Sequence, residues 1–150
     1  MSVKIDEIDK KILNELQEDA RASFRSIGEK IGVSEATVFI RIKKMRQRGI
    51  IKCFRADISP EKIGKGLKAF VLIKATPKRY PEALDNLKDI ENVYEIYDVT
   101  GVYYAILKIR TRDHDELART LDRIGSIEGI SSTETSVVLR TIKEESKINI

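Results

Sequence analysis

Residues 23–49, SFRSIGEKIGVSEATVFIRIKKMRQRG, decide the fold of the first part of this chain. Gly32-Val33 marks a tight turn between two amphipathic segments, and Ser34 is a residue type that commonly caps the N-terminus of a helix. The spacing predicts a short helix over 24–31 and a longer helix over 34–48. Two helices joined by such a turn form a helix-turn-helix.

The residues on either side extend this pattern. Before it, a helix over 6–18 is predicted by apolar residues at every fourth position: Ile8, Ile12 and Leu16. After it, Gly49 can end the long helix in a left-handed conformation, and residues 50–58 read as extended chain. Three helices followed by a strand are the order of a winged helix-turn-helix.

The predicted helix over 34–48 has two unlike faces. Val38, Ile42 and Met45 cluster on one side and are expected to pack inward. The opposite side combines cations with apolar groups, which can contact phosphates, base edges and thymine methyls in a DNA major groove. The residues expected to contact DNA are Ser34, Ala36, Thr37, Ile40, Arg41, Lys43, Lys44 and Gln47. The alternative is a basic helix that packs on another protein.

The charge distribution favours the nucleic-acid interpretation. Residues 1–58 hold thirteen Lys/Arg and nine Asp/Glu, whereas residues 59–150 hold fifteen of each, so the net charge of +4 lies entirely in the first part. A run of basic residues without an acid follows the turn: Arg41, Lys43, Lys44, Arg46, Arg48, Lys52 and Arg55. Such a run is often only a solvated face, but here it falls on the helix that would face DNA.

The second part of the chain contains a repeat of 37 residues, after a linker marked by Ser59-Pro60 and the glycines near residue 65. Each copy reads strand, helix, strand, and the predicted elements cover 67–75, 80–89, 93–99, 103–110, 114–125 and 130–141. Two such units in tandem predict a ferredoxin-like βαββαβ domain. The fold class is therefore α+β, with a winged helix-turn-helix followed by this domain.

Two of the predicted strands are apolar on both faces. Residues 69–73 and 105–107 lack the alternation expected of a sheet with one solvated face. Because two helices cover one face of such a sheet, the other face would form a large exposed apolar patch. A second copy of the domain is the expected cover, so the minimum unit is predicted to be a homodimer.

These patterns divide the chain into a DNA-binding domain over 1–52, a strand and linker over 53–66, a sensing and oligomerisation domain over 67–142, and a tail over 143–150. Cys53 is the only cysteine, which excludes an intrachain disulfide and a thiolate metal site, and no cofactor is expected. The N-terminus has no signal-peptide pattern and no apolar stretch is long enough to span a membrane, so a cytoplasmic protein is expected. Charged residues make up 35% of the chain and glutamine occurs only twice, which is typical of a heat-adapted protein.

Taken together, the motifs resemble the Lrp/AsnC family of transcription regulators over nearly the whole chain. In the first half the matches are Asp6 with Asp9, Leu16-Gln17 with Asp19-Ala20-Arg21, Gly32-Val33-Ser34, Arg41 and Gly49-Ile50-Ile51. In the second half they are Tyr97, residues 100–104 and residues 125–130. The resemblance implies dimers that assemble into octamers, amino acids bound between dimers, and control of amino-acid metabolism genes and of the regulator's own promoter.

One departure from the family pattern concerns the effector. The family often carries Thr-Gly-Asp-Tyr-Asp at the turn between the two repeats, but Val102 and Tyr104 occupy the acidic positions here. An ammonium group bound away from water needs a carboxylate or carbonyls, which leaves Asp98, Glu134 or the backbone near Gly101. The expected ligand-binding residues are Asp98, Thr100, Gly101, Val102, Tyr103, Tyr104, Thr133, Glu134 and Thr135. The alternative is that this segment is only a tight hairpin turn.

Two other functions are weighed against the regulator. A nucleoid-organising protein would bind DNA chiefly through phosphate charge and take no effector. Tetrapyrrole decarboxylases are similar to this family in architecture and would be expected to use a histidine in the second domain. The single histidine, His114, follows Asp113, which is expected to cap a helix and leave His114 in a solvated first turn. No enzyme activity is therefore expected.

Overall fold

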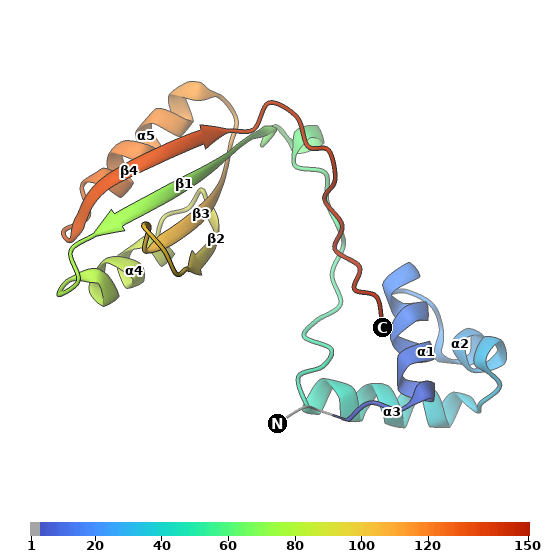
Figure 1. Ribbon diagram of the computed structural model, residues 1–150. Coiled ribbons are helices and arrows are strands. Elements are labelled where there is room, and N and C mark those ends of the chain that lie inside the picture. The colour runs from blue at the N-terminus through green and yellow to red at the C-terminus, as the bar shows by residue number, and fades with distance from the viewer. Residues whose placement is uncertain (1–3) are drawn as a thin grey trace. The chain divides into compact units, whose positions relative to one another are not determined.

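The computed structural model describes residues 4–150 and contains two compact units (Figure 1). The chain up to Asp57 and the segment Glu144–Ile150 form one, which we call the helical unit. Residues Ile58–Lys143 form the other, the sheet unit. The chain therefore passes from one unit to the other twice.

The helical unit consists of α1 (Glu7–Glu18), α2 (Phe24–Ile31) and α3 (Glu35–Gln47), which confirms the three predicted helices. Their apolar faces meet in a core formed by Ile12, Leu13, Ile27, Val38, Ile42 and Met45. Hydroxyl groups cap two of the helices: Ser23 Oγ accepts from the Ser26 amide and Ser34 Oγ from the Thr37 amide, both at 3.1 Å. Gly32 makes the turn between α2 and α3 with a φ of 79°, where glycine avoids the steric cost of a side chain.

The segment predicted as a strand after α3 is extended but forms no ladder with any residue that the structure describes. A strand exists only where a second chain segment completes its hydrogen bonds, and no described segment of the helical unit pairs with this one. The apolar side chain of Phe54 is 43% exposed and that of Ile58 is 60% exposed.

The sheet unit has the predicted βαββαβ order. Its elements are the short 3₁₀ helix η1 (Glu61–Ile63), β1 (Leu67–Ala75), α4 (Tyr80–Lys88), β2 (Val93–Asp98), β3 (Ala105–Thr111), α5 (His114–Gly125) and β4 (Ile130–Val137). The strands pair antiparallel in the order β2-β3-β1-β4, which confirms the ferredoxin-like fold. Five boundaries differ from the prediction. The ends of α4 and β2 each fall one residue early, at Lys88 and Asp98. β3 covers Ala105–Thr111 rather than 103–110, and β4 ends at Val137 rather than at 141.

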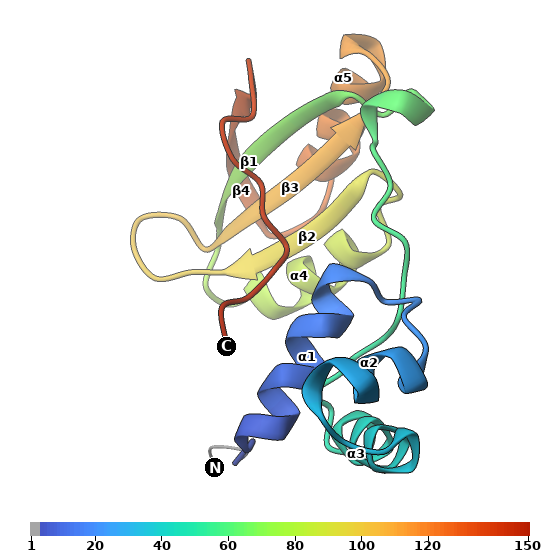
Figure 2. The same ribbon diagram turned by 90° about the vertical axis from the view of Figure 1, so that its right-hand side faces the viewer.

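The two faces of the sheet are unlike. Figure 2 shows α4 and α5 on the same side of the strands, and the buried core lies between them and side chains such as Val71, Leu107 and Ile109. On the opposite face, Phe70 and Leu72 of β1 are only half-buried, as is Ile106 beside them on β3. The second face therefore carries partly uncovered apolar side chains, but they lie beside charged ones, since Phe70 pairs with Lys108 and Leu72 with Glu134.

A polar network ties the chain before β1 to α5. Lys65 Nζ donates to Asn92 Oδ1 and to Glu116 Oε1, both at 3.0 Å, and Asn92 Nδ2 donates to Thr120 Oγ1 at 3.1 Å. The backbone N–H of Arg112 and the ammonium of Lys65 lower the pKa of Glu116 to about 2. This network holds the segment before β1 against the rest of the sheet unit.

The last residues of the chain lie against α1. Gln17 bonds the backbone of Ile148 twice: its amide nitrogen donates to the Ile148 carbonyl at 3.0 Å, and its carbonyl accepts from the Ile148 N–H at 2.7 Å. Lys147 Nζ adds an ion pair with Glu18 at 2.8 Å. The sequence indicated only a tail here, because nothing local to residues 147–150 points to a partner near residue 17. In residues 4–150, none of the helices is both long and apolar enough to cross a bilayer.

Candidate nucleic-acid interface

The exposed face of α3 is the first candidate surface. Val38, Ile42 and Met45 are buried as predicted, at no more than 3% exposure. On the opposite side five residues are exposed, and we call them the exposed α3 face: Ala36, Ile40, Lys43, Lys44 and Gln47. Ile40 is 50% exposed, although the helical unit has an apolar core in which isoleucine side chains are buried. Ser34 is exposed at the helix N-terminus and Thr37 is half-buried beside it.

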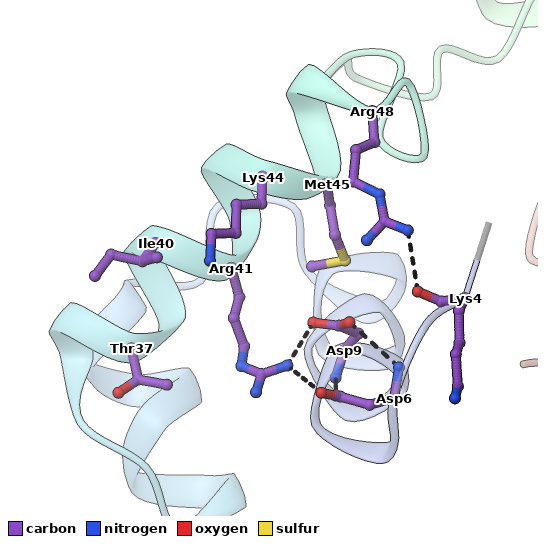
Figure 3. Close-up of a pocket in the computed structure, with 9 residues that line it drawn as sticks. All are labelled: Lys4, Asp6, Asp9, Thr37, Ile40, Arg41, Lys44, Met45 and Arg48. Carbon is purple, nitrogen blue, oxygen red and sulfur yellow. Dashed lines mark hydrogen bonds and ion pairs between the residues drawn. The ribbon is translucent and has the colours of Figure 1, made fainter.

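A hollow with a volume of about 540 Å³ borders one side of this face (Figure 3). Besides Thr37 and Ile40, its lining includes three cations: Lys4, Lys44 and Arg48. It also includes two carboxylates, Asp6 and Asp9. We call it the first hollow.

Arg41 also lines the first hollow, but its guanidinium is bound by the two aspartates. Arg41 Nη1 lies 2.6 Å from Asp6 Oδ2 and 2.9 Å from Asp9 Oδ1 (Figure 3). The hydrogen bond that Arg41 donates lowers the pKa of the Asp6 carboxyl, and the hydrogen bonds that it donates to both aspartates raise the pKa of Arg41. The sequence singled out both Asp6 with Asp9 and Arg41 as motifs, but could not show that they touch.

A second hollow, with a volume of about 420 Å³, borders the other side of the exposed α3 face. Its floor is apolar and its charged lining residues among those described are all cations: Lys43, Arg46 and Lys52. Phe24 and Phe39 pack with their ring centroids 6.0 Å apart, and the guanidinium of Arg46 lies 6.0 Å from the ring centroid of Phe54. Lys4, Arg46, Arg48 and Lys52 were missing from the predicted contacts, although three of them belong to the basic run.

The residues expected to bind an effector lie in the sheet unit in two groups. In the first, the loop between β2 and β3 projects from the sheet (Figure 2), with Thr100, Gly101 and Val102 exposed. Tyr80 on α4 holds the base of this loop: its hydroxyl donates to Asp98 Oδ1 at 2.6 Å and to the Tyr104 carbonyl at 2.9 Å. Burial and the hydrogen bond to Asp98 raise the pKa of Tyr80 to about 12. Tyr80 was not among the predicted residues, because it lies 18 positions from Asp98 on another element.

The second group surrounds Glu134 on β4. The Tyr103 hydroxyl donates to Glu134, which raises the pKa of Tyr103, and Lys74 Nζ lies 5.3 Å from the Tyr103 ring centroid. Thr133 and Thr135 pair with Ile73 and Val71, whose side chains point to the helix-covered face, whereas Glu134 pairs with the half-buried Leu72. The structure thus brings Glu134 and Tyr103 together, and places Thr133 and Thr135 on the other face of the sheet.

Two family models match the chain in the order of its units. A model of the AsnC-type helix-turn-helix domain matches residues 5–46, and a model of the Lrp/AsnC ligand binding domain matches residues 68–148. The chain belongs to the Lrp/AsnC family.

Relatives and solved structures agree with this assignment. The HTH-type transcriptional regulator FL11 of Pyrococcus horikoshii is 43% identical over 150 residues, which cover 100% of this chain and 99% of FL11. The regulatory protein AsnC of Escherichia coli is 38% identical over 93% of this chain and 96% of its own length. The solved structure of AsnC superposes with a TM-score of 0.93 at 35% identity, and the match covers 99% of this chain and 100% of that structure. The structure of a Neisseria meningitidis regulator, NMB0573, in complex with L-Met superposes with a TM-score of 0.90 at 25% identity, and the match covers 97% of this chain and 96% of that structure.

This Lrp/AsnC protein is therefore a helix-turn-helix transcription regulator with a ligand-binding domain, and the family and its relatives are regulators rather than enzymes. Its single histidine fits that assignment. Asp113 Oδ1 accepts from the Glu116 amide at 2.7 Å, so Asp113 caps α5 as predicted and His114 is exposed in the first turn. In the described part of the chain no cluster of His, Cys, Asp and Glu has the arrangement of a metal site.

Proposed function

We propose that this regulator recognises specific sequences in double-stranded DNA by placing α3 in the major groove. The observation that supports this is the exposed α3 face lying between two hollows lined by cations. A major groove is about 12 Å wide and has a phosphate backbone on either side, so a helix lying in it meets phosphates along both flanks. Ile40 would contact a thymine methyl, Gln47 a base edge, and the amides near Ser34 a phosphate. Ala36, Thr37, Lys43 and Lys44 complete the proposed surface.

The salt dependence of binding tests this proposal. A dimer in which each protomer neutralises about four phosphates is expected to give a slope of log K against log [salt] near −7. Lys44→Ala should lower the affinity for every duplex and make the slope shallower by about 2, since each phosphate contact contributes roughly 0.9 and a dimer loses two. Fluorescence anisotropy at several salt concentrations measures both quantities.

Lys88→Ala is the matched control, because Lys88 is an exposed lysine of the sheet unit. It should leave affinity and slope unchanged. The proposal is wrong if Lys44→Ala behaves like Lys88→Ala. Equal affinity for random DNA and for a duplex selected by the protein would favour the nucleoid-organising alternative instead.

We propose further that an amino acid or a related small molecule binds the sheet unit between dimers. The L-Met complex of the Neisseria meningitidis relative supports this class of ligand. Asp98 and Glu134 are the carboxylates proposed to receive the ammonium group, since the acidic positions of the family motif are Val102 and Tyr104 here. Thr100, Gly101 and Tyr103 are the further residues proposed to line the site, whereas Thr133 and Thr135 are left out because they lie on the other face of the sheet from Glu134.

A thermal-shift screen with each of the twenty amino acids tests the effector. A ligand present at one hundred times its Kd stabilises the folded state by about 2.7 kcal/mol, which a melting curve detects readily. Asp98→Asn or Glu134→Gln should abolish the shift produced by the active amino acid, while Asp85→Asn on α4 should preserve it. A shift that survives in both Asp98→Asn and Glu134→Gln would contradict the proposed ammonium site.

The proposed mechanism is a population shift between assemblies. An effector bound between dimers would favour one arrangement of dimers, up to an octamer, and so change the spacing of the α3 helices along DNA. In this view residues 1–52 bind DNA, 53–66 are the strand and linker, 67–142 sense the ligand and oligomerise, and 143–150 form the tail. The proposed targets are genes of amino-acid metabolism and the regulator's own promoter, in the cytoplasm of a heat-adapted cell.

A further inference from the structure

Arg41 lies on α3 among other basic residues, but its guanidinium is paired with carboxylates of the same unit, unlike a side chain that is free to bind a phosphate. Its side chain is 27% exposed, whereas Asp9, which it bonds, is 12% exposed and Asp6 is 55% exposed. One guanidinium nitrogen meets both carboxylates, at 2.6 and 2.9 Å. Together these three side chains carry a net charge of −1, which repels a phosphate.

The two aspartates are themselves fixed by the start of α1. Asp6 Oδ1 accepts from the Asp9 amide at 2.9 Å, and Asp9 Oδ2 accepts from the Asp6 amide at 3.3 Å, which is a reciprocal capping box. Each carboxylate therefore uses one oxygen for the backbone of α1 and the other for Arg41 (Figure 3). Arg41 is bonded to groups whose positions the α1 backbone already determines.

A second bond joins the same two segments farther along. Arg48, the C-cap of α3, donates from Nη2 to the Lys4 carbonyl at 3.1 Å. Positions 41 and 48 are two helical turns apart and on the same side of α3, with a separation of roughly 10 Å along the axis. Two bonds at this separation fix the tilt of a helix as well as its distance from its neighbour.

We propose that Arg41 is a positioning residue: its bonds to Asp6 and Asp9 set the angle at which Ile40, Lys43, Lys44 and Gln47 meet the base edges. It does not neutralise a DNA phosphate itself. This inference rests on the proposed binding of α3 in the major groove. It reverses the role that the basic run assigned to Arg41, and it gives Asp6 and Asp9 a part in sequence discrimination without contact with DNA.

Arg41→Gln separates the roles that this side chain can have. Affinity is measured for a duplex enriched by the wild-type protein from a random pool and for poly(dI-dC), each at several salt concentrations. A positioning residue predicts a loss of roughly tenfold for the selected duplex, of the order of one good base contact, with little change for poly(dI-dC) and in the salt slope. A phosphate contact predicts losses for both DNAs and a shallower slope, as for Lys44→Ala. If Arg41 serves stability alone, Arg41→Gln lowers the melting temperature and leaves both affinities of the folded protein unchanged, which contradicts the inference.

The double variant Asp6→Asn, Asp9→Asn provides an independent test in which Arg41 keeps its charge. Asparagine is also a good N-cap, so α1 should still begin at the same place. If Arg41 acts through the aspartates, this variant reproduces the selectivity loss of Arg41→Gln. If the aspartates only mask a phosphate-binding arginine, poly(dI-dC) binds more tightly and the salt slope becomes steeper, which overturns the inference. A wild-type protein that binds no duplex overturns the proposed DNA binding, and the inference with it.

Discussion

At the scale of single residues, the basic side chains of α3 differ in what they contact. Arg41 bonds two carboxylates and Arg46 lies over the ring of Phe54, while Lys43 and Lys44 are exposed. A count of charges treats all four alike, but exposed ammonium groups are the ones positioned to displace counterions from a phosphate backbone.

Glu116 gives a prediction about pH. Its pKa is about 2 in the folded protein and 4.5 in the unfolded chain, so it binds fewer protons when folded. The stability it contributes is present above pH 4.5 and is lost as the pH falls from 4.5 toward 2. Urea unfolding followed by circular dichroism should show that the free energy of unfolding falls less across this pH range for Glu116→Gln than for the wild type. Glu91→Gln, at an exposed position, should keep the pH profile of the wild type. If the profile of Glu116→Gln also runs parallel to that of the wild type, Glu116 is not the source of the pH-dependent stability.

The sequence predicted the residue types of the DNA surface better than their roles. Val38, Ile42 and Met45 were expected to point inward and do, because helical periodicity depends only on local geometry. The two carboxylates that Arg41 contacts lie 35 and 32 positions away at the start of α1, and no local pattern encodes such a distance.

At the scale of elements, periodicity predicted helices accurately and strand ends less well. The bounds of α5 match the prediction, whereas β4 ends four residues early. A helix completes its hydrogen bonds within its own segment, so its sequence contains the information that ends it. A strand ends where its neighbour ends: β1 begins at Leu67, and the ladder between β1 and β4 closes at Ala69 and Val137.

The turn between α2 and α3 gives a prediction at this scale. A Cβ added to Gly28 of α2 would lie 2.6 Å from the Val33 carbonyl oxygen, so the α2–α3 turn must shift to accept Gly28→Ala. We expect a loss of about 1–3 kcal/mol in the free energy of unfolding, as for other overpacked sites. Chemical denaturation measures it.

Gly125→Ala is the control, because Gly125 is also a helical glycine but a Cβ there meets nothing within 4 Å. It should be neutral or stabilising by up to about 1 kcal/mol, since alanine favours helix more than glycine does. Similar stability for the two alanine variants would mean that the α2–α3 turn can adjust without cost.

At the scale of the whole molecule, the 37-residue repeat predicted the topology of the sheet unit. Two copies of strand-helix-strand have few ways to close into one sheet, and the observed order β2-β3-β1-β4 is the ferredoxin-like one. The contact between Gln17 and Ile148 was beyond prediction, because it joins exposed residues 131 positions apart through the backbone of one of them.

The half-buried apolar face of the sheet predicts self-association. Phe70→Glu places a charge in this face and should shift the protein from dimer toward monomer, because an unpaired carboxylate is costly to bury. Light scattering coupled to size-exclusion chromatography measures the mass. Ala118→Glu adds the same charge at an exposed position of α5 and should leave the mass unchanged. A wild-type monomer at micromolar concentration would disprove the proposed dimer.

The position of residues Glu144–Ile150 determines what a label on this segment can report. A fluorophore attached after Ile150 would follow the motion of the helical unit, even though the sheet unit is what precedes it in sequence. A pair of dyes on α2 and on Asn149 would measure a distance within one unit and would not report rearrangement of the other. Dyes meant to detect movement between the units belong on α3 and on the β2–β3 loop.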